Sequence, residues 1–209
     1  MDLLMKCASS FQKLTGYEYR FTLGRKGMLK KITLGFSDTD FHHLAGLHKL
    51  KDIHVARANR DIVFQRILNG DITYDKLLKS QFLPTIQSRL NALPNLESLL
   101  DGNQLIFRYN KKIYPHSSIQ SEFLLKMGSE TVLGITFLFL DQAEQGIYFC
   151  RSFFPMEKTD YTKGQMQYTL LKKEKHNLKT NQHLIQYDHL TFQNESYTLY
   201  RRIFQLQLQ

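Results

Sequence analysis

The stretch FHHLAGLHKLKDIHVARANR, residues 41–60, gathers four histidines and two arginines into one segment. Its first nine residues follow a helical period, with one broad apolar face that also carries His48. On the same helical wheel, His42 falls on the opposite face and His43 lies at the edge between the two. The pattern therefore predicts a helix in which His48 is a core imidazole and His43 borders a site or the solvent.

The residues before this stretch predict a helix and then a β-hairpin. Apolar residues recur at helical spacing over 2–15, and the helix is expected to end near Gly16. Aromatic and apolar residues then alternate with polar ones over 17–23 and again toward residue 36, on either side of a turn at 24–27. Side-chain oxygens at 37–40 can cap the histidine-rich helix.

After this stretch, helices are expected up to residue 101 and strands beyond it. Asn59 and Thr73 are candidate N-caps, and Pro84 and Pro94 each fit the first turn of a short helix. Residues 133–140 are apolar on both faces, which favours a central strand. The expected strands of the second half are 104–109, 119–127, 131–140, 146–154, 168–175 and 183–190.

This order of elements predicts an α+β fold, with the helices gathered before a mainly antiparallel sheet. We expect one domain over residues 1–192, with a helical part at about 37–101 and a sheet part at about 104–190. Residues 193–209 form a C-terminal tail that is expected to add an extra strand at most.

Composition points to an anionic partner. The chain has 209 residues with 28 Lys and Arg against 19 Asp and Glu, a net charge of +9. Such a surface attracts nucleic acid first and anionic membrane second, although a basic surface without a special role is an alternative. The two cysteines lie far apart, and no signal peptide or membrane-length apolar run is found, so we expect a reduced, soluble, cytoplasmic protein without membrane contact.

Motifs for metal, nucleotide or acyl chemistry are missing from the sequence. No histidine pair in the predicted helix has the i, i+4 spacing of a helix-borne metal site, and there is no CxxC motif. The turn at 24–27 lacks the phosphate-binding pattern, and no serine nucleophile elbow occurs. We therefore predict no metal site and no cofactor.

Cationic residues remain as the candidate chemistry. Arg151 alternates with Ile147, Phe149 and Phe153, so its guanidinium is predicted on an apolar strand face, where it needs a carboxylate or a bound anion. A structural ion pair is the alternative. Lys163 and the Thr162 hydroxyl, in a polar loop at 160–165, could grip a phosphate or belong to a solvated turn.

The histidines complete this set. His43 is the better candidate for proton transfer, because an ordinary imidazole titrates near neutral pH, whereas His48 is predicted in the core. Together with the basic charge, these residues suit metal-independent cleavage of RNA. In that reaction a base takes the 2′-OH proton, cations hold the charge on the phosphorus, and an acid protonates the leaving oxygen.

Four segments carry a family resemblance: FHHLAGLHKLKDI, GNQLIFRYN, YFCRSFFPMEKTDYTKGQ and YTLLKKEK. In this order they resemble the fourth family of the phage Barnase–EndoU–colicin–RelE-like nucleases, over roughly residues 10–190. The resemblance implies helices packed on a curved antiparallel sheet, a metal-independent RNase activity, and a phage, plasmid or toxin-type context. It carries no agreed catalytic set.

The sequence thus predicts a toxin- or phage-type endoribonuclease that binds RNA and has, as an expected partner, a protein antidote. His43 is assigned as base or acid, Arg151 and Lys163 as phosphate clamps, and His48 as a buried orienter of the helix. Tyr161 and Thr162 would position substrate or act as the acid. The predicted substrate-binding residues are Arg57, Arg60, Arg108 and Lys172. The alternatives are an inert nucleic-acid-binding module, a protein-binding partner with an acidic target, and a DNase.

Overall fold

The structure is a computed structural model that describes residues 2–128 and 134–189. Its first half contains one hairpin and a block of short helices. The elements are α1 (Leu3–Leu14), β1 (Tyr17–Arg25), β2 (Met28–Leu34), α2 (Asp38–Leu44), η1 (Leu47–Lys49), η2 (His54–Ala56), α3 (Arg60–Leu68), α4 (Tyr74–Leu77), η3 (Leu83–Thr85), α5 (Gln87–Ala92), η4 (Leu93–Asn95) and α6 (Leu96–Asp101).

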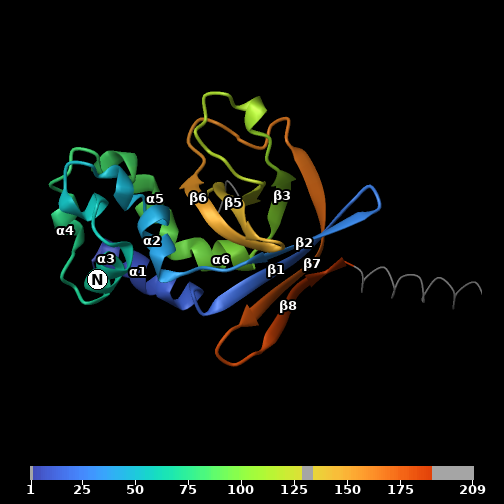
Figure 1. Cartoon of the computed structure of the whole chain (residues 1–209), viewed down its shortest axis with the longest axis horizontal. Coiled ribbons are helices and arrows are strands. Elements are labelled where there is room, and N and C mark those ends of the chain that lie inside the picture. Colours follow the sequence, from blue (N-terminus) through green and yellow to red (C-terminus); the bar gives the residue numbers. More distant parts are fainter. Residues whose placement is uncertain (1, 129–133, 190–209) are drawn as a thin grey trace, which may run out of the picture.

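The second half is built of strands and long loops. Its elements are β3 (Gln104–Arg108), η5 (Lys111–Ile113), β4 (Phe123–Met127), β5 (Thr136–Glu144), β6 (Ile147–Pro155), β7 (Met166–Asn177) and β8 (His183–Asp188). The helical block from α1 to α5 lies to one side of the strands, and α6 runs along one end of them (Figure 1). The predicted α+β class with helices gathered before residue 102 is confirmed.

The sheet closes on itself into a barrel, which differs from the expected curved sheet. The strand order is β1-β2-β6-β5-β4-β3-β7-β8, and β1 also pairs with β7, so the first seven strands of this order form a barrel. Closure is possible because β7 has 12 residues: its start pairs with β3, while its remainder pairs with β1 on one edge and β8 on the other. The hairpin thus belongs to the sheet, which extends beyond residues 104–190.

All strand pairs of this sheet are antiparallel except β2 with β6. The apolar stretch at 137–140 lies in β5, between β4 and β6, and its four residues are fully buried. This confirms the central position that its two apolar faces predict. The first part of the expected strand at 131–140, and the tail at 193–209, lie outside the described residues.

Strand β4 and the first half of β5 bury both of their faces. One face joins the helices in the main core, to which α1 contributes the buried Leu4, Cys7, Ala8, Phe11 and Leu14. The other face forms a smaller cluster of Phe107, Tyr109, Leu124, Phe137 and Phe139, covered by residues of the long loops such as Tyr114, Ile119 and Tyr161. These loops are therefore fixed on the sheet by apolar contacts.

Candidate active site

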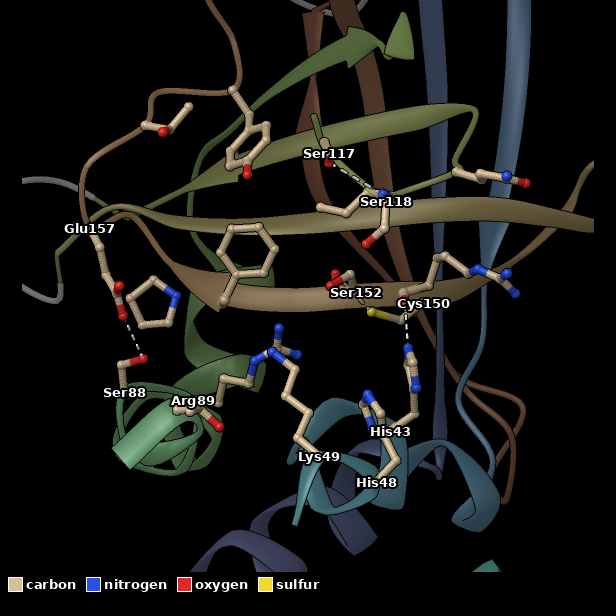
Figure 2. A pocket seen from close by; sticks show the side chains of 18 of the residues that line it. His43, His48, Lys49, Ser88, Arg89, Ser117, Ser118, Cys150, Ser152 and Glu157 are labelled. Atoms are coloured by element: carbon tan, nitrogen blue, oxygen red, sulfur yellow. Dashed lines mark hydrogen bonds between the residues drawn. The ribbon is translucent and has the colours of Figure 1, made fainter. Parts of the chain in front are cut away.

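A cavity of about 840 Å³ lies where the helical block meets β6. Figure 2 shows His43, His48, Lys49 and Arg89 on the helical side, Cys150 and Ser152 on the crossing strand, and Ser117 and Ser118 beyond it. The wall also includes Asp40, Arg60, Ser88, His116, Gln120, Arg151, Phe154, Glu157, Lys158 and Tyr161. Cations outnumber the two carboxylates of this wall, so the cavity suits an anion.

The helical side owes its shape to Gly46. The predicted helix ends early: α2 stops at Leu44, Gly46 has a φ of 80°, and η1 follows. A Cβ at Gly46 would lie 2.8 Å from Cγ2 of Ile86 and 3.2 Å from Cδ of Arg89. Only glycine fits this left-handed position so close to α5. The break also changes which histidines are buried.

His42 and His48 exchange the places that the helical wheel gives them. His42 is the buried one, 2% exposed, and its Nε2 hydrogen-bonds with the Val55 carbonyl at 2.9 Å. His48 is only partly buried and lines the cavity, so the prediction of a core position is wrong. The reason is the turn at Gly46, which rotates η1 relative to the axis of α2.

His43 is held in one tautomer when it is neutral. Its Nε2–H donates to the backbone carbonyl of Arg151 at 2.6 Å, which leaves Nδ1 with the free lone pair. Burial lowers the pKa of His43, and the nearby cations Arg89, Arg60 and Arg151 lower it further, against the effect of the carbonyl. The imidazole is therefore neutral at pH 7 and able to accept a proton.

His48 stacks on His43, with ring centroids 4.5 Å apart and planes at 16°. Burial, and then the charge that His43 would carry, lower the pKa of His48 to about 4. Two stacked imidazoles do not readily carry charge together, so a proton arriving at this pair goes to His43.

Arg89 is the most buried cation of the cavity. It is 8% exposed, and its guanidinium lies over the Phe154 ring, 5.3 Å from the centroid. Within residues 2–128 and 134–189 it forms no ion pair. Burial lowers the pKa of Arg89, and burial together with the charge of Arg89 lowers that of Lys49. A buried cation without a partner is costly, and a bound anion would compensate it.

Arg151 lies at the cavity, on the same face of β6 as Ile147 and Phe149, but this face is partly exposed and not buried. The pairing of β5 with β6 shifts between Phe139 and Leu140, so that Ser152 and Cys150 have partners and Arg151 has none. Arg151 is exposed at this β-bulge, whereas Phe153, two residues beyond it, is buried. The bulge also leaves the Arg151 carbonyl free to accept from His43.

Of the predicted site residues, the structure brings together His43, His48, Arg60, Arg151 and Tyr161. The others lie outside this cavity. Thr162 donates its hydroxyl to Asp160, and Lys163 is exposed in the same loop. Arg57 is exposed, Arg108 pairs with Glu122, and Lys172 pairs with Glu174 on β7.

The predictions miss Arg89 and Lys49, as well as the contact that holds the far wall. The Ser88 hydroxyl donates to Glu157 at 3.0 Å and so ties α5 to the loop after β6 (Figure 2). A signal for Arg89 was available: at helical spacing it shares the apolar stripe of Ile86, Leu90 and Leu93, all buried. A charged side chain in such an apolar stripe is rarely buried unless it is paired, so it indicates a binding site or a structural ion pair.

No group of three or more His, Cys, Asp or Glu side chains able to hold a metal ion is found in the described ranges. In the same ranges, no helix has the length and apolarity to cross a bilayer.

A comparison with protein families gives one finding. The family model described as phage-Barnase-EndoU-ColicinE5/D-RelE like nuclease 4 matches residues 3–190. No curated protein and no solved structure matches the chain.

Proposed function

Because the chain belongs to the family of phage-Barnase-EndoU-ColicinE5/D-RelE like nucleases, we propose that it is a metal-independent endoribonuclease with its active site in this cavity. The observation that carries the proposal is the buried guanidinium of Arg89, which has no ion pair among the described residues and lies beside Lys49 and the stacked pair His43–His48. This arrangement offers a bound phosphate two cations and a neutral base.

A bound phosphate would supply the negative charge that the two carboxylates of the cavity wall do not offer to its cations. Among the wall residues, Glu157 accepts from Ser88, and Asp40 accepts from the backbone N–H of Ser37 at the start of α2. Both carboxylates are therefore engaged in the wall itself. A phosphodiester that binds between Arg89 and Lys49 gains from their low-dielectric surroundings.

The reaction follows from the groups present. Nδ1 of His43 removes the 2′-OH proton, and the 2′ oxygen attacks the adjacent phosphorus. Arg89 and the outward Arg151 stabilise the charge that develops on the phosphorane oxygens. The bond to the 5′ oxygen then breaks, and that oxygen takes a proton from the Lys49 ammonium, whose lowered pKa makes it a better acid. The products are a 2′,3′-cyclic phosphate and a free 5′-OH.

Tyr161 has a positioning role in this proposal. Its ring lies in the aromatic cluster, 5.7 Å from Phe154 and 5.6 Å from Phe139 between centroids. The Arg89 guanidinium lies over the Phe154 ring, so Tyr161 holds Phe154, and through it Arg89, in position. The Tyr161 ring also presents an aromatic edge to the substrate. Thr162 and Lys163 have no part in the reaction as proposed here.

The test is incubation of the purified protein with end-labelled RNA in excess EDTA, with the products resolved on a denaturing gel. The proposal expects cyclic-phosphate ends that disappear in His43→Ala and Arg89→Met. Arg66→Met is the matched control, because Arg66 is half exposed on α3 and pairs with Asp71. Cleavage that requires a divalent cation would reject metal independence. RNA that is bound but never cut would favour the inert binding module.

A further inference from the structure

A second cavity, of about 460 Å³, adjoins the first one. The two share Gln120, which lies in the segment between η5 and β4. From the end of β3 the chain runs away from the strands through η5, and this segment then returns it to the sheet at β4 (Figure 1). The second cavity is lined by Arg108, Tyr109, Asn110, Lys111, Gln120 and Ser121.

We propose that this second cavity binds the nucleotide next to the scissile one, so that the substrate is a single RNA strand passing over Gln120. The inference rests on the proposed function for the identity of the first cavity. It adds a subsite that the reaction itself does not require.

The charge around the second cavity favours a phosphate. Lys111 is exposed, and Arg108 is 45% exposed at its side chain. Arg108 pairs with Glu122, but the same carboxylate also faces Lys30 at 3.5 Å and accepts from the Tyr148 hydroxyl. The single carboxylate of Glu122 thus faces two cations, Arg108 and Lys30, and Lys111 adds a third positive charge nearby. Basic side chains in this number attract the backbone of a nucleic acid.

The polar wall suits a sugar as well as a phosphate. The Ser121 hydroxyl is covered by protein and has no hydrogen-bond partner among the described residues. Rotation about its Cα–Cβ bond can direct it to a bound group, which would remove the cost of an unpaired hydroxyl. A ribose 2′-OH both donates and accepts, so it fits this hydroxyl.

The wall is formed before any ligand binds. Asn110 is held from both sides by Gln165: its N–H donates to Oε1 at 2.7 Å, and its carbonyl accepts from Nε2 at 3.3 Å. The Asn110 side chain in turn accepts from the N–H of Lys112 at 3.0 Å. A braced loop loses little freedom on binding.

The experiment is calorimetric titration of unlabelled RNA of one to four nucleotides into the His43→Ala variant, which leaves the substrate uncut in the proposed mechanism. We expect affinity to increase from one nucleotide to two or three. Lys111→Gln and Ser121→Ala should each reduce the affinity for RNA of two or three nucleotides by about fivefold to tenfold. Their affinity for a nucleoside 3′-monophosphate should stay unchanged. Lys112→Gln is the control, since it makes the same charge change one residue outside the cavity.

Two results would overturn the second subsite. One is a Lys111→Gln effect no larger than that of Lys112→Gln. The other is an equal loss for the monophosphate and the longer strands, which would mean a general effect on charge. The assay does not measure cleavage, so length-dependent binding by a protein that cuts no RNA would reject the nuclease proposal and still support the subsite.

Discussion

His43 on α2 donates a hydrogen bond of 2.6 Å from Nε2 to the backbone carbonyl of Arg151 on β6. The bond joins the helical block to the barrel at the cavity. It exists because a β-bulge leaves this carbonyl outside the ladder. This backbone irregularity therefore fixes the tautomer of His43 next to the exposed Arg151.

The first prediction concerns the pH dependence of cleavage. Burial holds the pKa of His43 below its ordinary 6.5, so the neutral form of the base predominates at pH 6.5. We expect the acidic limb of kcat/KM for RNA to be centred below pH 6.5. A pH profile of initial rates checks this. An acidic limb centred above pH 6.5 would contradict the role given to His43.

The second prediction separates function from stability at Arg89. Arg89→Met keeps the contact with Phe154 and removes a buried charge that has no ion pair within residues 2–128 and 134–189. We expect cleavage to fall by about a hundredfold or more. The free energy of unfolding should stay the same or rise by about 1 kcal/mol. Gel assays and urea titration measure the two effects. A large loss of stability would show that Arg89 is a structural residue.

The third prediction uses the titration of His48. Its pKa is about 4 in the folded protein, below the 6.5 of an ordinary imidazole, so the unfolded state binds more protons between these values. This contribution to stability is complete above pH 6.5 and is lost as the pH falls toward 4. For a half-buried ring we expect about 1 to 2 kcal/mol after solvent screening.

Urea unfolding at pH 7 and pH 4.5 tests this effect of His48. The loss of stability between the two conditions should be smaller in His48→Gln than in the natural chain, because glutamine does not titrate. Other acid-sensitive groups are common to both proteins and cancel in the difference. Equal losses would mean that His48 titrates normally in the folded protein.

The fourth prediction is that Gly46→Ala disturbs the cavity. The alanine would have to adopt a φ of 80°, and its Cβ would lie 2.8 Å from Cγ2 of Ile86. Ile86 directly precedes α5, the helix that carries Arg89. We expect a loss of about 1 to 3 kcal/mol in the free energy of unfolding, together with weaker cleavage. Gly27→Ala is a control with a similar φ of 78°, but with no atom within 4 Å. It should lose stability without losing activity per folded molecule.

The fifth prediction concerns a buried lysine far from the reaction. Lys173 is 2% exposed and donates to the carbonyls of Leu100, Asp101 and Gly102, where α6 ends. Lys173→Met leaves these acceptors without a partner, so we expect the free energy of unfolding to fall by about 2 to 4 kcal/mol. Thermal unfolding measures the loss. RNA cleavage below the transition should remain normal.

Local patterns predicted most of the helices and strands, although some of their bounds differ in the structure. The Asn59 cap is present, with its side-chain oxygen accepting from Asp61 and Ile62, because capping depends on residues within one turn. The double-faced apolar stretch at 137–140 was enough to place β5 in the centre. The quoted motifs predicted the nuclease family, which the comparison confirms.

Long-range contacts decided the rest. Helical spacing alone missed the end of α2, although a left-handed glycine just after a helix is a local stop signal. Only the fold shows that a Cβ at Gly46 would meet Ile86, forty residues further along the chain. Alternation could not show the bulge at Arg151, which arises from its pairing with β5. Closure of the barrel depends on β1 meeting β7. The sequence alone determined which elements form and what charge they carry. The tertiary structure decided which cations and imidazoles meet, because burial and partner choice depend on residues distant in the chain.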